Sequence, residues 1–397
     1  MRRAETSFLM ALAAVAALTG TVKARAETAK AVTFSMVYKL DVMGVAAGGV
    51  AAGGVNRGAV ALDNLSINAD ADLDTLLHWR GASAHVSFLT NQGGQPSTLA
   101  GSLQGIDNIE VAHPRAKIYE AWLDQSLAGG AVDVRAGLYD TNSEFNVTDS
   151  AGIFLAPTFG ISTEIAATGP NGPSIFPSPA LAVRVNFQPR PDLYVKVAAI
   201  DAHAGTIGDP GGVDTSFSDG LIMWGEAGWT AKGKIAVGVW GYTKGQSDIR
   251  DTLPSGAPRL SGSHGAYVMI DRPVLKVADD APQASVFLRF GVSDGDTTPY
   301  RAAGSVGVTT GHLIPGRPEG ALALGFSWGT FGTKYRANGA DAGAPLAVAE
   351  TAIELTYADK LGAHLTLQPD LQYVHHPSGD PAIRDAVVLG LRGAVSF

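Results

Sequence analysis

The sequence contains no cysteine, which excludes disulfide frameworks and thiolate chemistry. Charged residues are scarce, at 17% of the 397 residues. A low charged fraction suits a chain that exposes much of its surface to lipid, but it also suits a large soluble β protein, so both classes stay open. The formal net charge is -8 and there is no basic stripe to neutralise phosphates. We therefore expect no nucleic-acid partner.

Long apolar runs are also missing. After residue 27 there is no run of about 18 apolar residues, so a transmembrane helix is not expected. The N-terminus has Arg2 and Arg3, a short apolar stretch from Phe8 to Leu18, and an A-x-A site at 24–26. This pattern predicts a signal peptide over 1–26, cleaved near Ala26, rather than a membrane anchor. The mature chain, 27–397, would then be periplasmic, secreted or an outer-membrane barrel.

The mature chain consists of short segments in which apolar and polar residues alternate. In 364–373, Leu365, Leu367, Leu371 and Tyr373 alternate with polar residues, and 181–188 repeats the pattern. A period of two indicates a strand with two different environments. A soluble sandwich gives the same pattern, with its apolar face inward and in domains of about 100 residues.

About sixteen such segments follow one another, each close to the roughly 9–11 residues that a tilted strand needs to cross a bilayer. They begin near residues 32, 59, 82, 116, 131, 180, 193, 220, 234, 264, 284, 304, 320, 350, 363 and 386.

The connections alternate in length, which favours a barrel over a sandwich. Long connections follow the odd-numbered segments, at 43–58, 91–115, 140–179, 202–219, 244–263, 293–303, 329–349 and 374–385. The others are mostly short, at 74–81, 125–130, 190–192, 231–233, 273–283, 313–319 and 359–362. Long loops on one rim and tight turns on the other are typical of outer-membrane barrels. The predicted fold is an all-β, transmembrane, antiparallel up-and-down β-barrel of sixteen strands.

Two hairpins give a register that can be checked. A two-residue turn at Gly129-Gly130 places Asp124 opposite Arg135 and Glu120 opposite Tyr139, so that polar and apolar residues separate onto two faces. At 231–233, a three-residue loop with Gly233 in the left-handed region is preferred to a two-residue loop. It places Trp224, Glu226, Trp240 and Tyr242 on one face and leaves Val237 and Val239 for lipid.

Motifs for catalysis and metal binding are missing from the sequence. There is no G-x-S-x-G elbow and no H-E-x-x-H motif, and the Walker-like stretch 228–234 continues with Ile235 instead of Ser or Thr. His375 and His376 are adjacent on a strand end, where side chains are expected to point to opposite faces. We therefore predict no catalytic, cofactor-binding or metal site, no cofactor, and no enzymatic activity.

The connection 140–179 is by far the longest, at about forty residues, whereas loops beyond about 15 are usually functional or disordered. It is rich in apolar residues, including Phe145, Phe154, Phe159 and Phe176. Full solvation of such a loop would be costly. We hypothesise that it folds into the barrel and narrows the pore.

Polar side chains on the inward face predict the chemistry of a pore for polyols. Charged forks can hydrogen-bond several hydroxyls at once, and aromatic faces can pack on the C–H face of a pyranose. A residue that only solvates the wall or pairs across strands would look the same in the sequence. The strand parity selects Glu120, Trp122, Asp124, Arg135, Tyr139, Arg184, Asn186, Trp224, Glu226, Trp240, Arg289, Glu354 and Arg392.

Several stretches resemble the carbohydrate-selective porins of the OprB type. They include GGVNRGAVALDNL (53–65), NQGGQPSTLAGSLQGIDNIE (91–110), YEAWLDQ (119–125), RAGLYDTNSEF (135–145) and GPSIFPSPALAVRVNFQP (172–189). The resemblance is spread over most of the mature chain but is weak over 244–345. It implies a sixteen-stranded barrel and passive diffusion of monosaccharides such as glucose through a lumen constricted by arginine and acidic residues.

The resemblance makes Arg135 and Glu120 the strongest carried-over positions, followed by Arg184. Together with the parity argument, it gives a predicted constriction of Arg135, Glu120, Arg184, Trp122, Asp124, Tyr139, Glu226 and Trp240. The implied location is the outer membrane of a Gram-negative bacterium, in contact with lipid and lipopolysaccharide, as a monomer or homotrimer.

Three other functions remain open from the sequence. The chain could be a general or small-acid diffusion porin, a barrel enzyme, or a plugged structural barrel. An enzyme would need a Ser–His or acidic–His constellation at one rim, and none stands out in the sequence.

Overall fold

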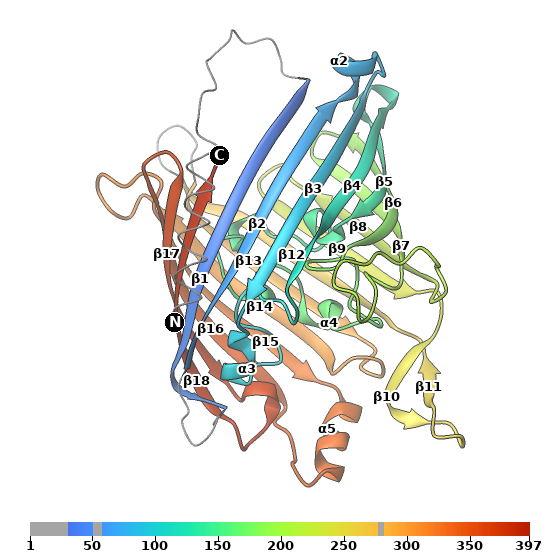
Figure 1. The fold of residues 1–397 in the computed structure, drawn as a ribbon, viewed down its shortest axis with the longest axis vertical. Coiled ribbons are helices and arrows are strands. Elements are labelled where there is room, and N and C mark those ends of the chain that lie inside the picture. The colour runs from blue at the N-terminus through green and yellow to red at the C-terminus, as the bar shows by residue number, and fades with distance from the viewer. Residues whose placement is uncertain (1–30, 51–57, 277–281) are drawn as a thin grey trace.

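The computed structural model describes residues 31–50, 58–276 and 282–397, and in these residues sixteen strands form one closed antiparallel barrel (Figure 1). The barrel strands are β1 (Val32–Gly49), β2 (Gly58–Asp72), β3 (Ala82–Gly93), β4 (Arg115–Leu127), β5 (Val132–Tyr139), β6 (Ala180–Arg190), β7 (Leu193–Asp201), β8 (Leu221–Trp229), β9 (Lys234–Tyr242), β12 (His264–Lys276), β13 (Pro282–Ser293), β14 (Tyr300–Gly311), β15 (Ala321–Phe331), β16 (Ala349–Leu361), β17 (Leu365–His375) and β18 (Arg384–Ser396). The predicted signal peptide lies outside the described residues.

Each barrel strand pairs with its neighbours along the chain, and β1 pairs with β18 to close the sheet. Closure satisfies the backbone groups that would otherwise form an unpaired edge in hydrocarbon. The predicted architecture and strand count are confirmed. The segment expected near 304 begins earlier, at Tyr300, so the connection before it is 294–299 rather than 293–303.

The remaining elements lie in the connections between barrel strands. They are the two-stranded sheet β10 (Gln246–Thr252) and β11 (Pro258–Ser261), and the helices α2 (Leu73–Leu77), α3 (Pro96–Ala100), α4 (Thr163–Ala166) and α5 (Thr333–Asp341). Short 3₁₀ turns occur at Ala128–Gly130, Thr141–Ser143, Asp149–Ala151, Pro157–Phe159 and Pro377–Gly379. No helix in the described part of the chain is long and apolar enough to span a membrane.

The two rims differ as the connection lengths predict. In Figure 1, α2 lies at the rim of the short connections, whereas α5 and the β10–β11 hairpin project from the opposite rim. The sequence analysis treated 244–263 as a plain loop and did not predict this hairpin.

The first strand is longer than predicted. The sequence indicated a connection over 43–58, but β1 continues to Gly49, so the prediction is wrong for 43–49. Met43 and Val45 pack in a buried cluster with Leu62, and this apolar contact keeps the segment in the sheet. The pairing of β1 with β18 shifts register near Ala47, where the first GVAAG copy ends. Most of the second copy lies outside the described residues.

The hairpin between β8 and β9 has the predicted register. Trp224 lies opposite Trp240, and Gly233 has the expected positive φ of 97°. Val237 and Val239 point outward, with 57% and 61% of their surface exposed. Their exposure fits the lipid-facing band of an outer-membrane barrel.

The hairpin between β4 and β5 keeps the predicted register but has a different turn. Asp124 lies opposite Arg135, as expected. The strands separate after the Leu127–Val132 pair, so the connection has four residues, 128–131, and the predicted two-residue turn is wrong. Ala128, Gly129 and Gly130 all have positive φ. A two-residue turn would require positive φ only at the two glycines.

Candidate pore constriction

The connection 140–179 lies inside the barrel, as hypothesised. Arg289 on β13 holds it through three backbone carbonyls. Its guanidinium donates to the carbonyls of Asn146 at 2.8 Å, Gly160 at 3.0 Å and Thr158 at 2.7 Å. Hydrogen bonds from a charged donor are about twice as strong as neutral ones. Arg289 is therefore a buried anchor for the loop rather than an open lumen residue.

Wall carboxylates hold the same loop through its backbone N–H groups. Glu226 on β8 accepts from the N–H of Asn146 at 2.8 Å. Glu354 on β16 accepts from the N–H groups of Leu155 at 2.6 Å and Ala156 at 3.0 Å. Since β8 and β16 lie far apart around the barrel, the loop crosses much of the lumen.

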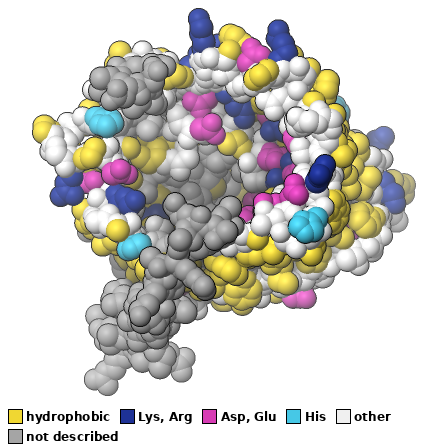
Figure 2. Space-filling model, turned by 90° about the horizontal axis from the view of Figure 1, so that it is seen from above, with side chains coloured by type: hydrophobic (Ala, Val, Ile, Leu, Met, Phe, Trp, Pro, Cys, Tyr) yellow, Lys and Arg dark blue, Asp and Glu magenta, His cyan; other side chains and the backbone are white. Residues whose placement is uncertain are grey.

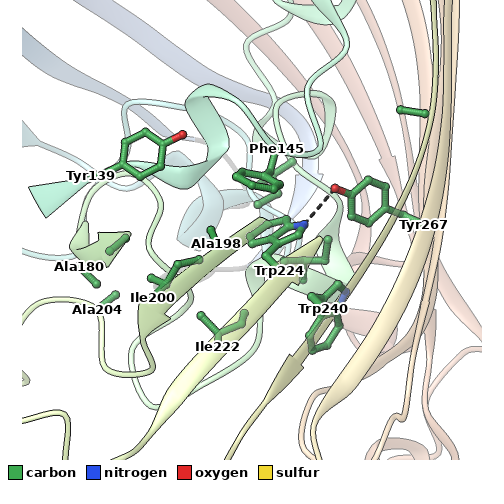
Figure 3. Packing of buried hydrophobic residues seen from close by; sticks show 14 of the residues in the cluster. Tyr139, Phe145, Ala180, Ala198, Ile200, Ala204, Ile222, Trp224, Trp240 and Tyr267 are labelled. Carbon is green, nitrogen blue, oxygen red and sulfur yellow. Dashed lines mark hydrogen bonds between the residues drawn. The ribbon is translucent and has the colours of Figure 1, made fainter. Parts of the chain in front are cut away.

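Apolar packing fixes the start of the inward loop against β7, β8 and β9. Phe145 lies on Trp224, with ring centroids 5.4 Å apart, and the indole N–H of Trp224 donates to the hydroxyl of Tyr267 at 2.9 Å (Figure 3). Trp240 belongs to the same cluster and is only 3% exposed. The cluster fills the space between the loop and the barrel wall.

A second connection, 94–114, also enters the lumen and contacts the first. The N–H of Asn108 donates to the carbonyl of Leu155 at 2.7 Å. Glu350 on β16 accepts from the backbone N–H groups of Leu103 and Gln104 at 3.0 and 3.1 Å. The sequence analysis identified this connection as long but did not place it inside the barrel.

Two arginines and two carboxylates gather where the inward loop leaves β5. Arg135 on β5 donates to Asp124 on β4 at 2.9 Å and lies 3.3 Å from Glu144 of the loop. Arg184 on β6 donates to Asp124 at 3.0 Å and to Glu144 at 2.8 Å. Burial opposes ionisation of Glu144, but Arg135 and Arg184 overcome it and lower the pKa of this carboxyl. The four side chains form a compact set of paired charges at the edge of the lumen.

Aromatic rings surround this charged cluster. The guanidinium of Arg135 lies 3.6 Å from the centre of the Trp122 ring and 5.1 Å from that of Tyr139. His85 stacks on Trp122 at 4.9 Å. The Trp122 face beneath Arg135 is thus already covered, and a pyranose could stack there only by displacing the guanidinium.

Two lysines continue the line of positive charge along the wall. Lys196 on β7 lies 3.6 Å from Glu226, and Lys234 on β9 lies 3.8 Å from it. Lys196 also donates to the carbonyl of Glu144, and Lys234 to that of Val147 at 2.8 Å. These cations are paired with Glu226 and with the inward loop.

The structure groups the predicted site residues into two sets. Arg135, Arg184, Trp122, Asp124 and Tyr139 form one cluster. Glu120 borders this cluster and accepts a hydrogen bond from the backbone N–H of Asp140 at 3.0 Å. Glu226 and Trp240 lie beneath the inward loop, 2% and 3% exposed, and contact the loop and the wall rather than the open lumen.

Sequence reasoning missed three residues that contact the candidate constriction. Glu144 lies on the inward loop, where no strand periodicity marks its direction, although it is part of the RAGLYDTNSEF stretch at 135–145. Lys196 and His85 lie on strands with the inward parity but were not selected. The resemblance covers Glu144, but neither the resemblance nor the residue pattern selected it.

Charged groups of both signs are visible from the rim of the short connections. Figure 2 shows a hollow barrel with Lys, Arg, Asp and Glu side chains along part of its inner wall. A closed sixteen-strand barrel with an apolar outer band and a charged lumen narrowed by inward loops defines a porin.

Comparison with known proteins gives the family. The family model described as carbohydrate-selective porin, OprB family, matches residues 56–397, so the chain belongs to that family. Porin B of Pseudomonas aeruginosa is 23% identical over 370 residues, which cover 83% of this chain and 80% of that protein. The protein is therefore a sugar diffusion channel of the Gram-negative outer membrane, and its family and fold are those of a channel.

Solved structures show the same fold. The high-pH structure of Pseudomonas putida OprB has a TM-score of 0.82 and 22% identity, covering 93% of this chain and 94% of that chain. The anion-selective porin from Comamonas acidovorans has a TM-score of 0.54 and 14% identity, covering 92% of this chain and 99% of that chain. At these identities the likeness supports the barrel alone.

Proposed function

We propose that this porin passes monosaccharides such as glucose by passive diffusion, and that Arg135, Arg184, Asp124 and Glu144 form the polar side of its constriction. The observation that carries the proposal is the shared hydrogen-bonding of these four groups. Two guanidinium forks and two carboxylates offer donors and acceptors within one cluster, which suits a solute with several adjacent hydroxyls.

The pairing of charges favours a neutral solute over a small acid. Arg135 and Arg184 are both in contact with Asp124 and Glu144, and Lys196 and Lys234 both lie near Glu226. A small acid would meet a carboxylate beside each of these four cations. A neutral polyol can exchange hydrogen bonds with either sign without that repulsion.

Three further residues of the predicted site, Trp122, Trp240 and Glu226, are assigned supporting roles. Trp122 lies under Arg135 and fixes its position. Trp240 and Glu226 hold the inward loop against the wall. The apolar outer band, including Val237 and Val239, would contact the hydrocarbon of outer-membrane lipid.

Liposome swelling tests the proposed function. The untagged protein is refolded into liposomes, and swelling rates are compared for glucose, glutamine and triethylene glycol, three uncharged or net-neutral solutes of similar size. We expect glucose to enter faster than triethylene glycol, and Arg135→Gln to lower that ratio. Arg80→Gln, an exposed change in the short connection between β2 and β3, should leave the ratio unchanged. Equal rates for all three solutes in the wild type would show a general pore.

A further inference from the structure

The connection between β7 and β8, residues 202–220, carries a group of potential metal ligands that is separate from the cluster of Arg135, Arg184, Asp124 and Glu144. One ligand atom each from His203, Asp214 and Asp219 lies within 4.8 Å of the other two. Nδ1 of His203 is 3.1 Å from Oδ2 of Asp219 and 3.9 Å from Oδ2 of Asp214. Two donors of a tetrahedral ion with bonds of about 2.1 Å are about 3.4 Å apart, so small side-chain shifts would place all three around one ion.

A fourth group provides an independent reason to expect a ligand there. Asp201, the last residue of β7, is 1% exposed, and its Oδ2 has no hydrogen-bond partner. Its carboxylate feels the charges of His203, Asp214 and Asp219, although its oxygens do not belong to the group of three ligand atoms within 4.8 Å of one another. A buried carboxylate oxygen without a partner is costly and is uncommon in native structures.

The charge balance at this cluster points in the same direction. Three carboxylates face one imidazole, and in the described part of the chain the ion-pair partner of Asp214 and Asp219 is His203 alone. Even a protonated His203 would leave two negative charges uncompensated. A divalent cation would neutralise them and would also offset the charge of the nearby buried Asp201.

We propose that His203, Asp214 and Asp219, beside the buried carboxylate of Asp201, bind one divalent transition-metal ion, with Zn²⁺ as the best-fitting probe. Imidazole suits Zn²⁺ and related ions, whereas Ca²⁺ takes six to eight oxygen ligands. The mixed donor set with one nitrogen therefore selects against Ca²⁺. The side chains of His203, Asp214 and Asp219 are 18%, 17% and 42% exposed, so an ion has access from solvent.

The ion would join the two ends of this connection. Asp201 and His203 lie at its beginning, and Asp214 and Asp219 near its end. Ala204, the residue after His203, is buried in the apolar cluster under the inward loop. Its carbonyl accepts a hydrogen bond from the side chain of Asn171 of that loop at 2.6 Å. Metal binding would thus also stabilise the outer part of the loop that narrows the pore.

Isothermal titration with Zn²⁺ tests the site on the untagged, chelator-treated protein in detergent at neutral pH. We expect one Zn²⁺ per wild-type chain, and at least a tenfold loss of affinity in His203→Gln and in Asp214→Asn/Asp219→Asn. His375→Gln is the matched control, because it removes another His–Asp pair, with Asp385 at 2.7 Å. Its affinity should equal that of the wild type.

The proposal would be overturned by the absence of one-site Zn²⁺ binding, by equal affinities in wild type and site variants, or by tighter binding of Ca²⁺ than Zn²⁺. If the site variants fail to fold, X-ray absorption spectroscopy of the Zn²⁺-loaded wild type tests the proposal, because it identifies the atoms that coordinate the ion. A shell of nitrogen and oxygen with one imidazole supports the site. Two or more imidazoles would place the ion at other histidines and overturn it.

Discussion

The guanidinium of Arg135 lies over the indole of Trp122, 3.6 Å from the ring centre, and the two residues belong to the neighbouring strands β5 and β4. A cation in this position is stabilised by about 0.5–2 kcal/mol, depending on how far it is desolvated. The same guanidinium contacts Asp124 and Glu144. Trp122, together with these two carboxylates, therefore determines where the donors of Arg135 point.

Replacing Trp122 should change sugar selectivity through Arg135. Trp122→Leu removes the ring, so Arg135 can adopt other rotamers, and we expect the ratio of glucose to triethylene glycol swelling rates to fall. The fall should be smaller than in Arg135→Gln, which removes the donors themselves. Trp122→Phe keeps an aromatic face and should retain most of the ratio. A wild-type ratio in Trp122→Leu would contradict this role.

The strand pattern could be predicted because a barrel wall imposes one rule on every strand. One face meets lipid and the other meets the lumen, so alternation gives both the strands and their registers. This is why the Trp224–Trp240 and Asp124–Arg135 pairs were predicted correctly. The register does not reveal the length of the turn. A four-residue turn with the same centre gives the same strand pairs as a two-residue turn, so the predicted turn was wrong although the register was correct.

The constriction was less predictable, because parity identifies the inward face but does not show what covers it. Asp124 and Glu226 have the same inward direction, yet Glu226 is buried under the loop and Asp124 is at its edge. The path of the loop depends on distant contacts, such as Arg289 with the carbonyl of Thr158, and no local pattern encodes these. Glu144 was missed for the same reason.

Loss of Arg289 should widen the pore. Arg289→Met removes three hydrogen bonds to loop carbonyls, each worth about 1.5–3 kcal/mol for a charged donor. We expect single-channel conductance in planar bilayers to rise, with added open-channel noise, to a value between those of the wild type and of a deletion of 146–172. Arg301→Met changes an exposed arginine of the adjacent strand and should have no effect. Unchanged conductance in both the deletion and Arg289→Met would mean that the loop does not limit flow.

Neutralising Glu144 should make the pore more selective for anions. The carboxyl is held ionised by Arg135 and Arg184, so Glu144→Gln removes one negative charge from between two cations. A unit charge at an assumed distance of about 7 Å from the ion path contributes about 0.6 kcal/mol in water-like dielectric, with opposite sign for K⁺ and Cl⁻, so the permeability ratio should change about sevenfold. The reversal potential in a KCl gradient should therefore shift toward the chloride equilibrium potential, and Arg135→Gln should shift it the opposite way. Shifts of equal sign in both variants would exclude a direct electrostatic effect.

The buried carboxyl of Glu164 on α4 should make the barrel less stable in alkali. Burial raises its pKa to about 8, although the charge of Arg289 acts in the opposite direction. In the unfolded chain a glutamate titrates near pH 4.3, so between about pH 4.3 and 8 the folded state binds more protons. Stability from this group is therefore complete below about pH 4.3 and is lost as the pH rises to about 8.

Glu164→Gln keeps the size of the side chain and removes its charge. Its apparent Tm in detergent should match that of the wild type at pH 4.5 and exceed it at pH 8.5, so the difference between the two proteins should grow with pH. Glu319→Gln, at an exposed position between β14 and β15, should follow the wild type at every pH. A constant difference between Glu164→Gln and the wild type would show that Glu164 does not take up its proton on folding, because only a change in proton binding gives a stability difference that depends on pH.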